Sequence, residues 1–271
     1  MRTVLICHVG APLDREGLAR WLASFSELAG VIVLKERNKR RFRRISREVQ
    51  RVGFFRFLDV LAFRLFDKIF HRRFDSKWER KELAKLCQRY PEIPLKSLIL
   101  EADSPNSPEA EAFLHSTKPD ILIARCKTLL KERIYSLAST GTFVFHPGIC
   151  PEYRNAHGCF WALANRDLNN VGMTLLRVDS GVDTGPVYGH FSYPFDEVKE
   201  SHHIVQQRVV FENLDKIKHR LLEIHAGQAN PQDVRGRPSM MWGQPWLSSY
   251  LRWKRDARKR RRNESHHDSI S

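Results

Sequence analysis

The hydrophobic pattern at the start of the chain is typical of a parallel sheet crossed by a helix. Residues 3–9 form an apolar run, residues 13–28 repeat apolar positions at helical spacing, and residues 31–34 form a second apolar run. A strand, a helix and a strand in this order make the βαβ unit of a parallel sheet, so we expect an α/β fold.

The same alternation returns after residue 93. The pattern predicts strands at 93–100, 120–124, 142–146, 172–179 and 185–195 and helices at 107–116, 131–139, 158–165 and 201–225. Ser107 followed by Pro108 is the expected start of the first of these helices, because proline fits the first helical position. We therefore expect a Rossmann-like, mostly parallel sheet flanked by helices.

A segment at 35–88 interrupts this alternation and is too long for a connection in a compact domain. We interpret it as a basic helical insertion with an amphipathic helix. The apolar positions that define its face are Phe54, Leu58, Leu61, Leu65 and Ile69. Such a face either packs on the sheet, which we favour, or lies on an anionic bilayer.

The whole chain divides, on this interpretation, into a domain at 1–227 that includes the insertion and a C-terminal extension at 228–271. The end of the extension is basic and polar, and we expect it to be disordered. No run of about 18 apolar residues predicts a membrane-spanning helix. We expect a cytoplasmic protein.

Charge is concentrated in two segments of this 271-residue chain, whose net charge is +15. Residues 35–51 carry nine Lys or Arg against two Glu, and residues 252–262 carry eight against one Asp. Both segments suit an anionic partner such as a nucleic acid, a lipid surface or a phosphate-bearing substrate. The alternative is a solvated helix face and a basic tail. The five cysteines lack metal-like spacing, which favours reduced thiols and no metal site.

A candidate reaction centre follows the expected strand at 142–146. His146 ends this strand and precedes a Pro-Gly turn, and ligands of open α/β sheets bind beyond the carboxyl ends of strands. Asp183 lies in the turn VDSGVDTGP, where Gly181 and Gly185 permit unusual backbone angles. A carboxylate held there can orient an imidazole and favour its protonated form, and we expect an accessible imidazole.

Two stretches, HPGICPEYRNAHGCFWALANRD and GMTLLRVDSGVDTGPVY, resemble the 10-formyltetrahydrofolate-dependent formyltransferase family. The family includes glycinamide ribonucleotide and methionyl-tRNA formyltransferases. The run KPDILIARCKTLLKERIYSL also resembles its segment that ends in a folate-contacting loop. The resemblance covers about residues 93–227. It does not cover the insertion or the tail.

This resemblance implies transfer of a formyl group from 10-formyltetrahydrofolate, a co-substrate, to an amine. His146 would stabilise the oxygen of the reacting formyl group, and Asp183 would hold His146 cationic and help to remove the amine proton. The co-substrate would lie between two loops. The residues assigned to it are Lys127, Thr128, Leu129, Leu130, Asp179 and Val182.

Three departures from the family pattern affect this assignment. Val144 stands where the family has an asparagine that donates to the developing oxyanion. Asn155 or His157, in the altered turn YRNAHG, is a candidate replacement donor, or Asn155 only occupies a turn position that usually needs glycine. Thr128 stands where the family often has arginine, and the phosphate-binding turn of the glycinamide ribonucleotide enzymes is absent.

Three functions fit these observations. We expect formyl transfer to a small-molecule amine such as an amino sugar or an amino acid derivative. Formylation of methionyl-tRNA suits the positive charge, although the 44 residues after Gly227 are too few for the separate barrel of such enzymes. A catalytically degenerate member that binds nucleic acid or anionic membrane is the third, which Val144 favours and which His146 and Asp183 together disfavour.

Overall fold

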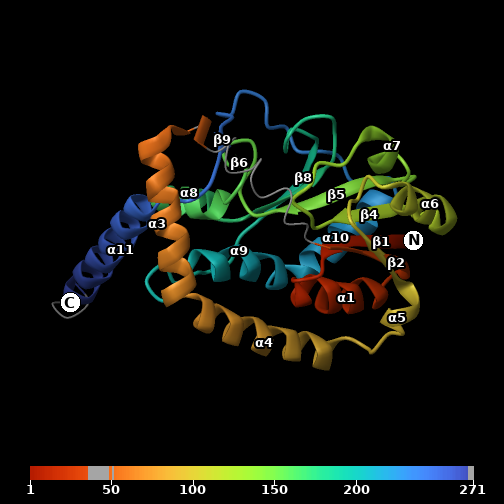
Figure 1. The fold of residues 1–271 in the computed structure, drawn as a ribbon, viewed down its shortest axis with the longest axis horizontal. Coiled ribbons are helices and arrows are strands. Elements are labelled where there is room, and N and C mark those ends of the chain that lie inside the picture. The colour runs from red at the N-terminus through yellow and green to blue at the C-terminus, as the bar shows by residue number, and fades with distance from the viewer. Residues whose placement is uncertain (36–48, 51, 268–271) are drawn as a thin grey trace.

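The computed structural model describes residues 1–35, 49–50 and 52–267, and its centre is a seven-stranded sheet (Figure 1). The strand order is β3-β2-β1-β4-β5-β7-β8. The first five strands of this order are parallel, and β7 and β8 are antiparallel to their neighbours. The strands are β1 (Arg2–His8), β2 (Glu27–Leu34), β3 (Ile99–Ala102), β4 (Ile121–Ala124), β5 (Gly141–His146), β7 (Met173–Arg177) and β8 (Val187–Phe191). The predicted mostly parallel α/β fold is confirmed.

Helices cover both faces of this sheet, as Figure 1 shows. The larger core contains Leu5, Phe143 and Phe145 from the sheet, and the helices α1, α4, α8, α9 and α10 pack on that face. The smaller core contains Val4 and Ile6, covered by α6 and α7. Neighbouring residues of one strand enter different cores because side chains alternate between the faces of a sheet. The helices are η1 (Leu13–Leu18, a π-helix), α1 (Ala19–Ala23), α3 (Phe54–Phe70), α4 (Arg72–Arg89), α5 (Leu95–Leu98), α6 (Pro108–Thr117), α7 (Glu132–Tyr135), α8 (Gly158–Ala164), η2 (Leu168–Asn170, a 3₁₀ helix), α9 (His202–Phe211), α10 (Leu214–His225) and α11 (Leu247–His267).

Three predicted elements differ from the observed ones. The strand expected at 93–100 begins only at Ile99, where the chain comes into register with Val31 of β2, and α5 occupies the residues before it. The helix expected at 201–225 is two helices. Asn213 separates them, because its side-chain amide donates to the carbonyl oxygens of Val209 and Ser192. The helix expected at 13–28 ends at Ala23, and β2 begins at Glu27.

The insertion is helical in its described part, but its apolar face points away from the protein. Leu65 on the predicted face is 61% exposed, whereas Phe57, Val60 and Phe63 on another face are buried. The Phe63 ring lies 5.6 Å from that of Tyr250 in α11, so α3 packs on α11 rather than on the sheet. The expectation of sheet packing is therefore wrong. Residues 36–48 and 51 of the first basic segment lie outside the described residues.

The C-terminal extension is ordered against the rest of the molecule. Its strand β9 (Met241–Trp242) pairs with β6 (Arg154–Asn155) in a second, two-stranded sheet. Helix α11 then adds Trp253 and Ala257 to the larger core. The expected disorder is therefore wrong for residues 252–262, because the apolar side of α11 is buried in the domain. None of the helices in the described segments combines the length and the apolar character needed to span a bilayer.

Candidate active site

His146 is the last residue of β5 and lies beneath the turn that follows it. In β5, Phe143 and Phe145 face the larger core, so His146 points to the other side of the sheet. The imidazole is only 5% exposed, because the chain folds back across it. The prediction of an accessible imidazole is therefore wrong. Gly148 makes this fold-back possible, since an added Cβ would lie 2.6 Å from the Tyr153 carbonyl oxygen.

Both ring nitrogens of His146 face hydrogen-bond acceptors. Nε2 lies 2.7 Å from the carbonyl oxygen of Tyr153, and Nδ1 lies 3.4 Å from Oδ2 of Asp183. A neutral imidazole carries a proton on one nitrogen only, whereas the imidazolium carries one on each. The arrangement therefore offers an acceptor to a proton on either ring nitrogen. The structure brings His146 and Asp183 together.

The loop that carries Asp183 is held rigidly by its own hydrogen bonds. Asp183 adopts a left-handed backbone conformation with φ 51°, which is uncommon for a residue other than glycine. Oδ1 of Asp179 accepts from the Gly181 amide and from the Thr184 hydroxyl, both at 2.9 Å. Gly185 approaches the Arg177 carbonyl so closely that a Cβ would lie 1.8 Å from the oxygen. The loop therefore presents the Asp183 carboxylate in one position.

Asn155 links this loop to the C-terminal extension. Its amide N–H donates to Oδ2 of Asp183 at 2.8 Å, and its side-chain amide donates to the carbonyl oxygen of Trp242. Its φ of 78° is a conformation that asparagine tolerates better than most residues. Of the two roles predicted for Asn155, this geometry favours the turn position. The backbone of Asn155, rather than its side chain, contacts the Asp183 carboxylate.

His157 also has a left-handed backbone, with φ 56°, and it immediately precedes α8. Its Nδ1 is buried without a hydrogen-bond partner among the described residues. Burial, together with the positive charge of Lys127, lowers the pKa of His157 from 6.5 to about 4. His157 is thus a neutral imidazole at neutral pH. It can take part in a hydrogen bond but supplies no positive charge.

Val144 lies on the same face of β5 as His146, but its surroundings are apolar. It packs against a small cluster formed by Cys150, Leu176 and Val187, together with Val234 of the C-terminal extension. Burial raises the pKa of the Cys150 thiol to about 12, so this neighbour is uncharged. An asparagine that donates to substrate at this position would need a polar opening. The structure has an apolar contact there instead.

The four predicted co-substrate residues after β4 form a loop at the carboxyl end of the sheet. Because β4 pairs in parallel with β5, this loop lies at the same end as His146. The backbone N–H of Lys127 donates to His8 Nε2 at 3.2 Å, and Asn106 donates to the carbonyl oxygen of Leu129 at 2.9 Å. The Leu129 side chain is 63% exposed, whereas Leu130 packs into the smaller core. Thr128 follows Lys127 and is half-buried.

The second predicted co-substrate loop is already engaged by the protein. The Val182 carbonyl oxygen accepts from the Arg154 guanidinium at 3.1 Å, and Asp179 holds its own loop closed. The structure therefore places Asp179 and Val182 beside the turn that carries Arg154 and Asn155. The polar atoms of Asp179 serve that loop.

Arg125 is a residue of the site that sequence reasoning missed. Its guanidinium donates to Asp14 Oδ1 at 3.1 Å and to the Phe145 carbonyl oxygen at 2.8 Å. Asp14 and Arg125 are both nearly buried, so each charge is compensated by the other. Arg125 thereby fixes the end of β5 next to His146. An arginine directly after the apolar run ILIA is the sequence signal that could have identified it.

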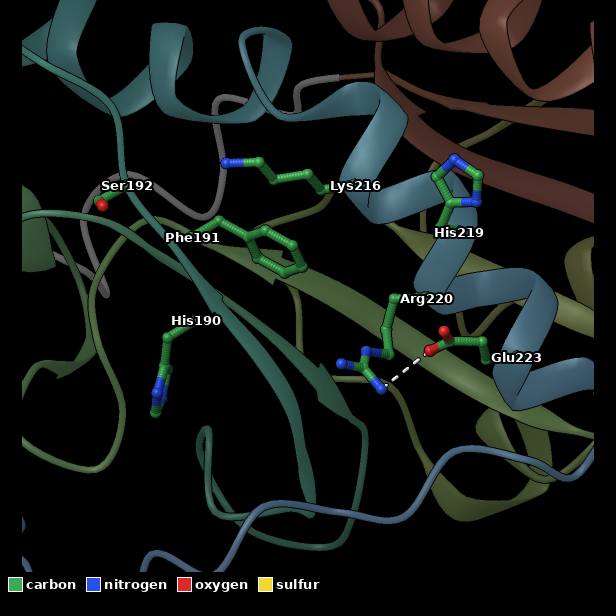
Figure 2. Close-up of a pocket in the computed structure, with 7 residues that line it drawn as sticks. All are labelled: His190, Phe191, Ser192, Lys216, His219, Arg220 and Glu223. Carbon is green, nitrogen blue, oxygen red and sulfur yellow. Dashed lines mark ion pairs between the residues drawn. The ribbon is translucent and has the colours of Figure 1, made fainter.

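A cavity of about 410 Å³ lies at the edge strand β8 and helix α10 (Figure 2). Its lining residues are His190, Phe191, Ser192, Lys216, His219, Arg220 and Glu223. Figure 2 shows Arg220 paired with Glu223 and His190 turned away from the α10 side chains. None of the predicted site residues lines this cavity. It is separate from the pair formed by His146 and Asp183.

Comparison with known proteins now identifies relatives of this chain. Residues 76–222 match the family model described as formyl transferase. A methionyl-tRNA formyltransferase of Thermotoga neapolitana is 32% identical over 126 residues, which are 46% of this chain and 36% of that protein. One of Dehalococcoides mccartyi is 31% identical over 109 residues, 37% of this chain and 35% of that protein. The matched segment spans about a third of the length of these curated relatives.

Solved structures share the fold at low sequence identity. A sugar N-formyltransferase from Shewanella has a TM-score of 0.54 and 14% identity, and the match covers 90% of this chain and 77% of that one. A phosphoribosylglycinamide formyltransferase from Anaplasma phagocytophilum has a TM-score of 0.52 and 13% identity, with 90% and 99% covered. These two likenesses show a shared architecture.

Proposed function

We propose, from the premise that this chain belongs to the formyl transferase family, that it transfers a formyl group from 10-formyltetrahydrofolate to an amine of a small-molecule acceptor. The observation that carries the proposal is the pair formed by His146 and Asp183, with 3.4 Å between Nδ1 and Oδ2. The pair lies at the carboxyl end of β5, where ligands of such sheets bind. An amino sugar or an amino acid derivative is the acceptor class that we propose.

The two residues have complementary roles in this proposal. The co-substrate would supply the formyl group, whose carbon the acceptor amine attacks as the bond to the donor nitrogen breaks. Negative charge develops on the formyl oxygen, and a cationic His146 stabilises it electrostatically. Asp183 keeps His146 cationic, accepts the proton that the amine loses and passes it to the departing donor nitrogen, which leaves as a neutral amine. The nearly buried position of His146 strengthens these effects, because little water screens the charges.

The residues around the pair are compatible with a folate co-substrate. Leu129 exposes its side chain at the carboxyl end of β4, which provides an apolar surface for a flat ring system. Two buried polar atoms, Nδ1 of His157 and Nε of Arg154, have no hydrogen-bond partner among the described residues, and both belong to the turn between β5 and α8. Buried polar atoms normally have a partner, and a bound ligand would supply one. Leu129, Leu130 and the 179–183 loop would hold the co-substrate.

Formylation of methionyl-tRNA is the second candidate. The sequence relatives described above favour it, and so does the net charge of +15. Both candidates use the same pair of residues and the same formyl donor. They differ only in the acceptor, so one set of assays separates them.

The test is a turnover assay with 10-formyltetrahydrofolate and a panel of amines that includes amino sugars, amino acids and methionyl-tRNA. Release of tetrahydrofolate without transfer, by hydrolysis, is monitored in parallel. We expect transfer to at least one small amine, and its loss in His146→Ala and in Asp183→Asn. Transfer to methionyl-tRNA alone would support the second candidate. Folate binding without any turnover would contradict both and favour a catalytically degenerate protein.

A further inference from the structure

Helix α3 carries an exposed apolar face with no partner among the described residues. Its side chains form one continuous row along the helix, because positions three and four apart lie on the same side. Phe55 beside the row is 86% exposed, and Leu65 within it is 61% exposed. The row, called here the α3 stripe, consists of Phe54, Leu58, Leu61, Leu65 and Ile69.

Helix α3 is firmly packed on the protein, so the exposure of the stripe does not result from a loosely attached helix. The opposite side of α3 is anchored: the Phe63 ring lies 5.5 Å from Phe160 of α8, and Val60 is fully buried. Asp59 also accepts from the backbone N–H of Ser248 at the start of α11, at 3.0 Å. Figure 1 shows α3 at the periphery of the molecule, next to α11 and α8. The packing therefore holds the apolar stripe outward.

A basic groove continues the stripe at its C-terminal end. The groove has a volume of about 730 Å³ and runs from the end of α3 onto α4. Ile69 belongs to both the stripe and the groove, so the two surfaces are contiguous. The other residues that line the groove are Lys68, Arg72, Arg73, Ser76, Lys77 and Arg80. Five of these side chains are cationic, and none is acidic.

We propose that the α3 stripe and the basic groove together form a docking surface for an anionic lipid bilayer. A helix that lies in the plane of a membrane places an apolar face in the acyl region and cations at the headgroups. The stripe supplies the apolar face, and the groove supplies the cations next to it. The surface binds the bilayer from one side without spanning it.

Charge decides between a membrane and a second copy of the chain. Each copy carries a net charge of +15, and five of its cations line the groove at the contact itself. Two copies that meet through this surface would bring like charges together. Phosphatidylglycerol or phosphatidylserine headgroups instead compensate the groove, and their acyl chains cover the stripe.

The composition of the stripe argues against a nucleic acid as the occupant. Leu58, Leu61 and Leu65 form its centre, and leucine neither stacks on bases nor donates to phosphates. The groove alone suits any polyanion, but it would leave the stripe in water. An anionic bilayer is the partner that satisfies both parts.

The experiment is flotation of the full chain with vesicles of phosphatidylcholine, with and without phosphatidylglycerol. We expect the wild-type protein to float with the anionic vesicles and to remain below with the neutral ones. Two substitutions separate the contributions: Leu58→Ser with Leu65→Ser for the stripe, and Arg72→Glu with Lys77→Glu for the groove. Each cation near an anionic surface is worth roughly fivefold in binding, so the groove variant should bind at least roughly 25-fold more weakly.

The matched control is Lys96→Glu with Lys216→Glu, which changes the net charge equally on exposed surfaces remote from α3. We expect the loss of vesicle binding in this control variant to be less than half of the loss in the groove variant. We expect all variants to fold, because every substituted side chain is exposed. Circular dichroism measures whether they do. Equal weakening in the control and the groove variant would overturn the proposal.

Two further outcomes would overturn it. One is binding to RNA, unchanged in the stripe variant, with no binding to vesicles. The other is a dimer that the stripe variant converts to a monomer. Formyl transfer is not a readout in this experiment, so its result is independent of the function proposed above.

Discussion

Two histidines eleven residues apart show how different the surroundings of the same side chain can be in one protein. His146 faces a carbonyl oxygen and a carboxylate, so both of its nitrogens have acceptors for a proton. His157 lies at the next turn, where burial and the charge of Lys127 lower its pKa to about 4. Its Nδ1 has no partner in the described structure. The difference places two acceptors around one imidazole and leaves a nitrogen of the other without a partner.

The largest expected effect is on turnover in His146→Ala. If His146 stabilises the developing oxyanion as proposed, its removal should lower the rate of formyl transfer by about 10²–10⁴-fold. Steady-state kinetics with the best acceptor measures it. The matched control is His190→Ala, because Thr174 pairs with both histidines across neighbouring strands and His190 therefore lies on the same face. A His146→Ala enzyme with near-normal turnover would place the reaction centre elsewhere.

The next effect is on stability at acidic pH. The pKa of His157 is about 4 in the folded state and 6.5 ordinarily, so the unfolded state binds more protons between these values. The contribution of neutral His157 to the free energy of unfolding is therefore fully present above pH 6.5. It is lost as the pH falls towards 4, and the total loss is about 3 kcal/mol. Burial also lowers the pKa of His202, which acts in the same direction.

Urea unfolding at a series of pH values between 7 and 4 measures this loss. His157→Asn is the informative variant, since asparagine tolerates the left-handed backbone at this position. We expect a shallower dependence on pH in the variant than in the wild type. Identical pH profiles for the two proteins would show that His157 is not kept neutral by burial.

A smaller effect is expected for Val144→Asn. The substitution places an amide in the apolar cluster of Cys150, Leu176 and Val187, at a cost of about 1–3 kcal/mol in unfolding free energy. Urea unfolding measures this cost, with Val9→Asn, an exposed valine, as the control. The turnover of the same variant tests the oxyanion donor: a marked rise means that neither Asn155 nor His157 replaces the family asparagine.

The smallest expected effect is a difference in stability between two variants of Asn155, which separates backbone strain from the loss of a hydrogen bond. Both Asn155→Gly and Asn155→Ala remove the side-chain bond to the Trp242 carbonyl. Only alanine is strained at a φ of 78°, so we expect it to be less stable than glycine by about 1 kcal/mol. Thermal unfolding of the two variants measures the difference. Equal stability would mean that the turn relaxes to another conformation.

The sequence predicted the central features because they depend on local rules. Continuous apolar runs predicted β4 and β5, and the position of His146 at the end of such a run placed it at the ligand-binding edge. The glycines of the 179–185 loop indicated a tight turn, and the structure brings Asp183 of that turn to His146. Pattern and turn chemistry suffice where neighbours in sequence determine the geometry.

The errors arose where contacts distant in sequence decide the outcome. The sequence predicts that the apolar face of α3 packs on the sheet, but α11, nearly 200 residues later, covers a different face through Tyr250, whose ring contacts Phe63 and Phe66. His146 was expected to be accessible, because the hydrogen bond from the imidazole to the Tyr153 carbonyl is not visible in a linear pattern. Arg125 was missed because its partners, Asp14 and Phe145, lie on other elements.

The contact between the C-terminal extension and α8 gives this protein an intrinsic optical reporter. The indole rings of Trp161 and Trp242 are stacked, with 4.9 Å between centroids, and Trp246 meets Trp161 edge-on. Stacked indoles at this distance couple electronically and give a near-ultraviolet circular dichroism signal that separated rings lack. Because Trp242 belongs to the extension and Trp161 lies in α8, just after the turn that carries Asn155 and His157, that signal reports whether the extension is seated against this turn. Trp242→Phe removes the stacked pair, so the loss of signal in this variant is its contribution, and the pair of Trp161 and Trp246 remains.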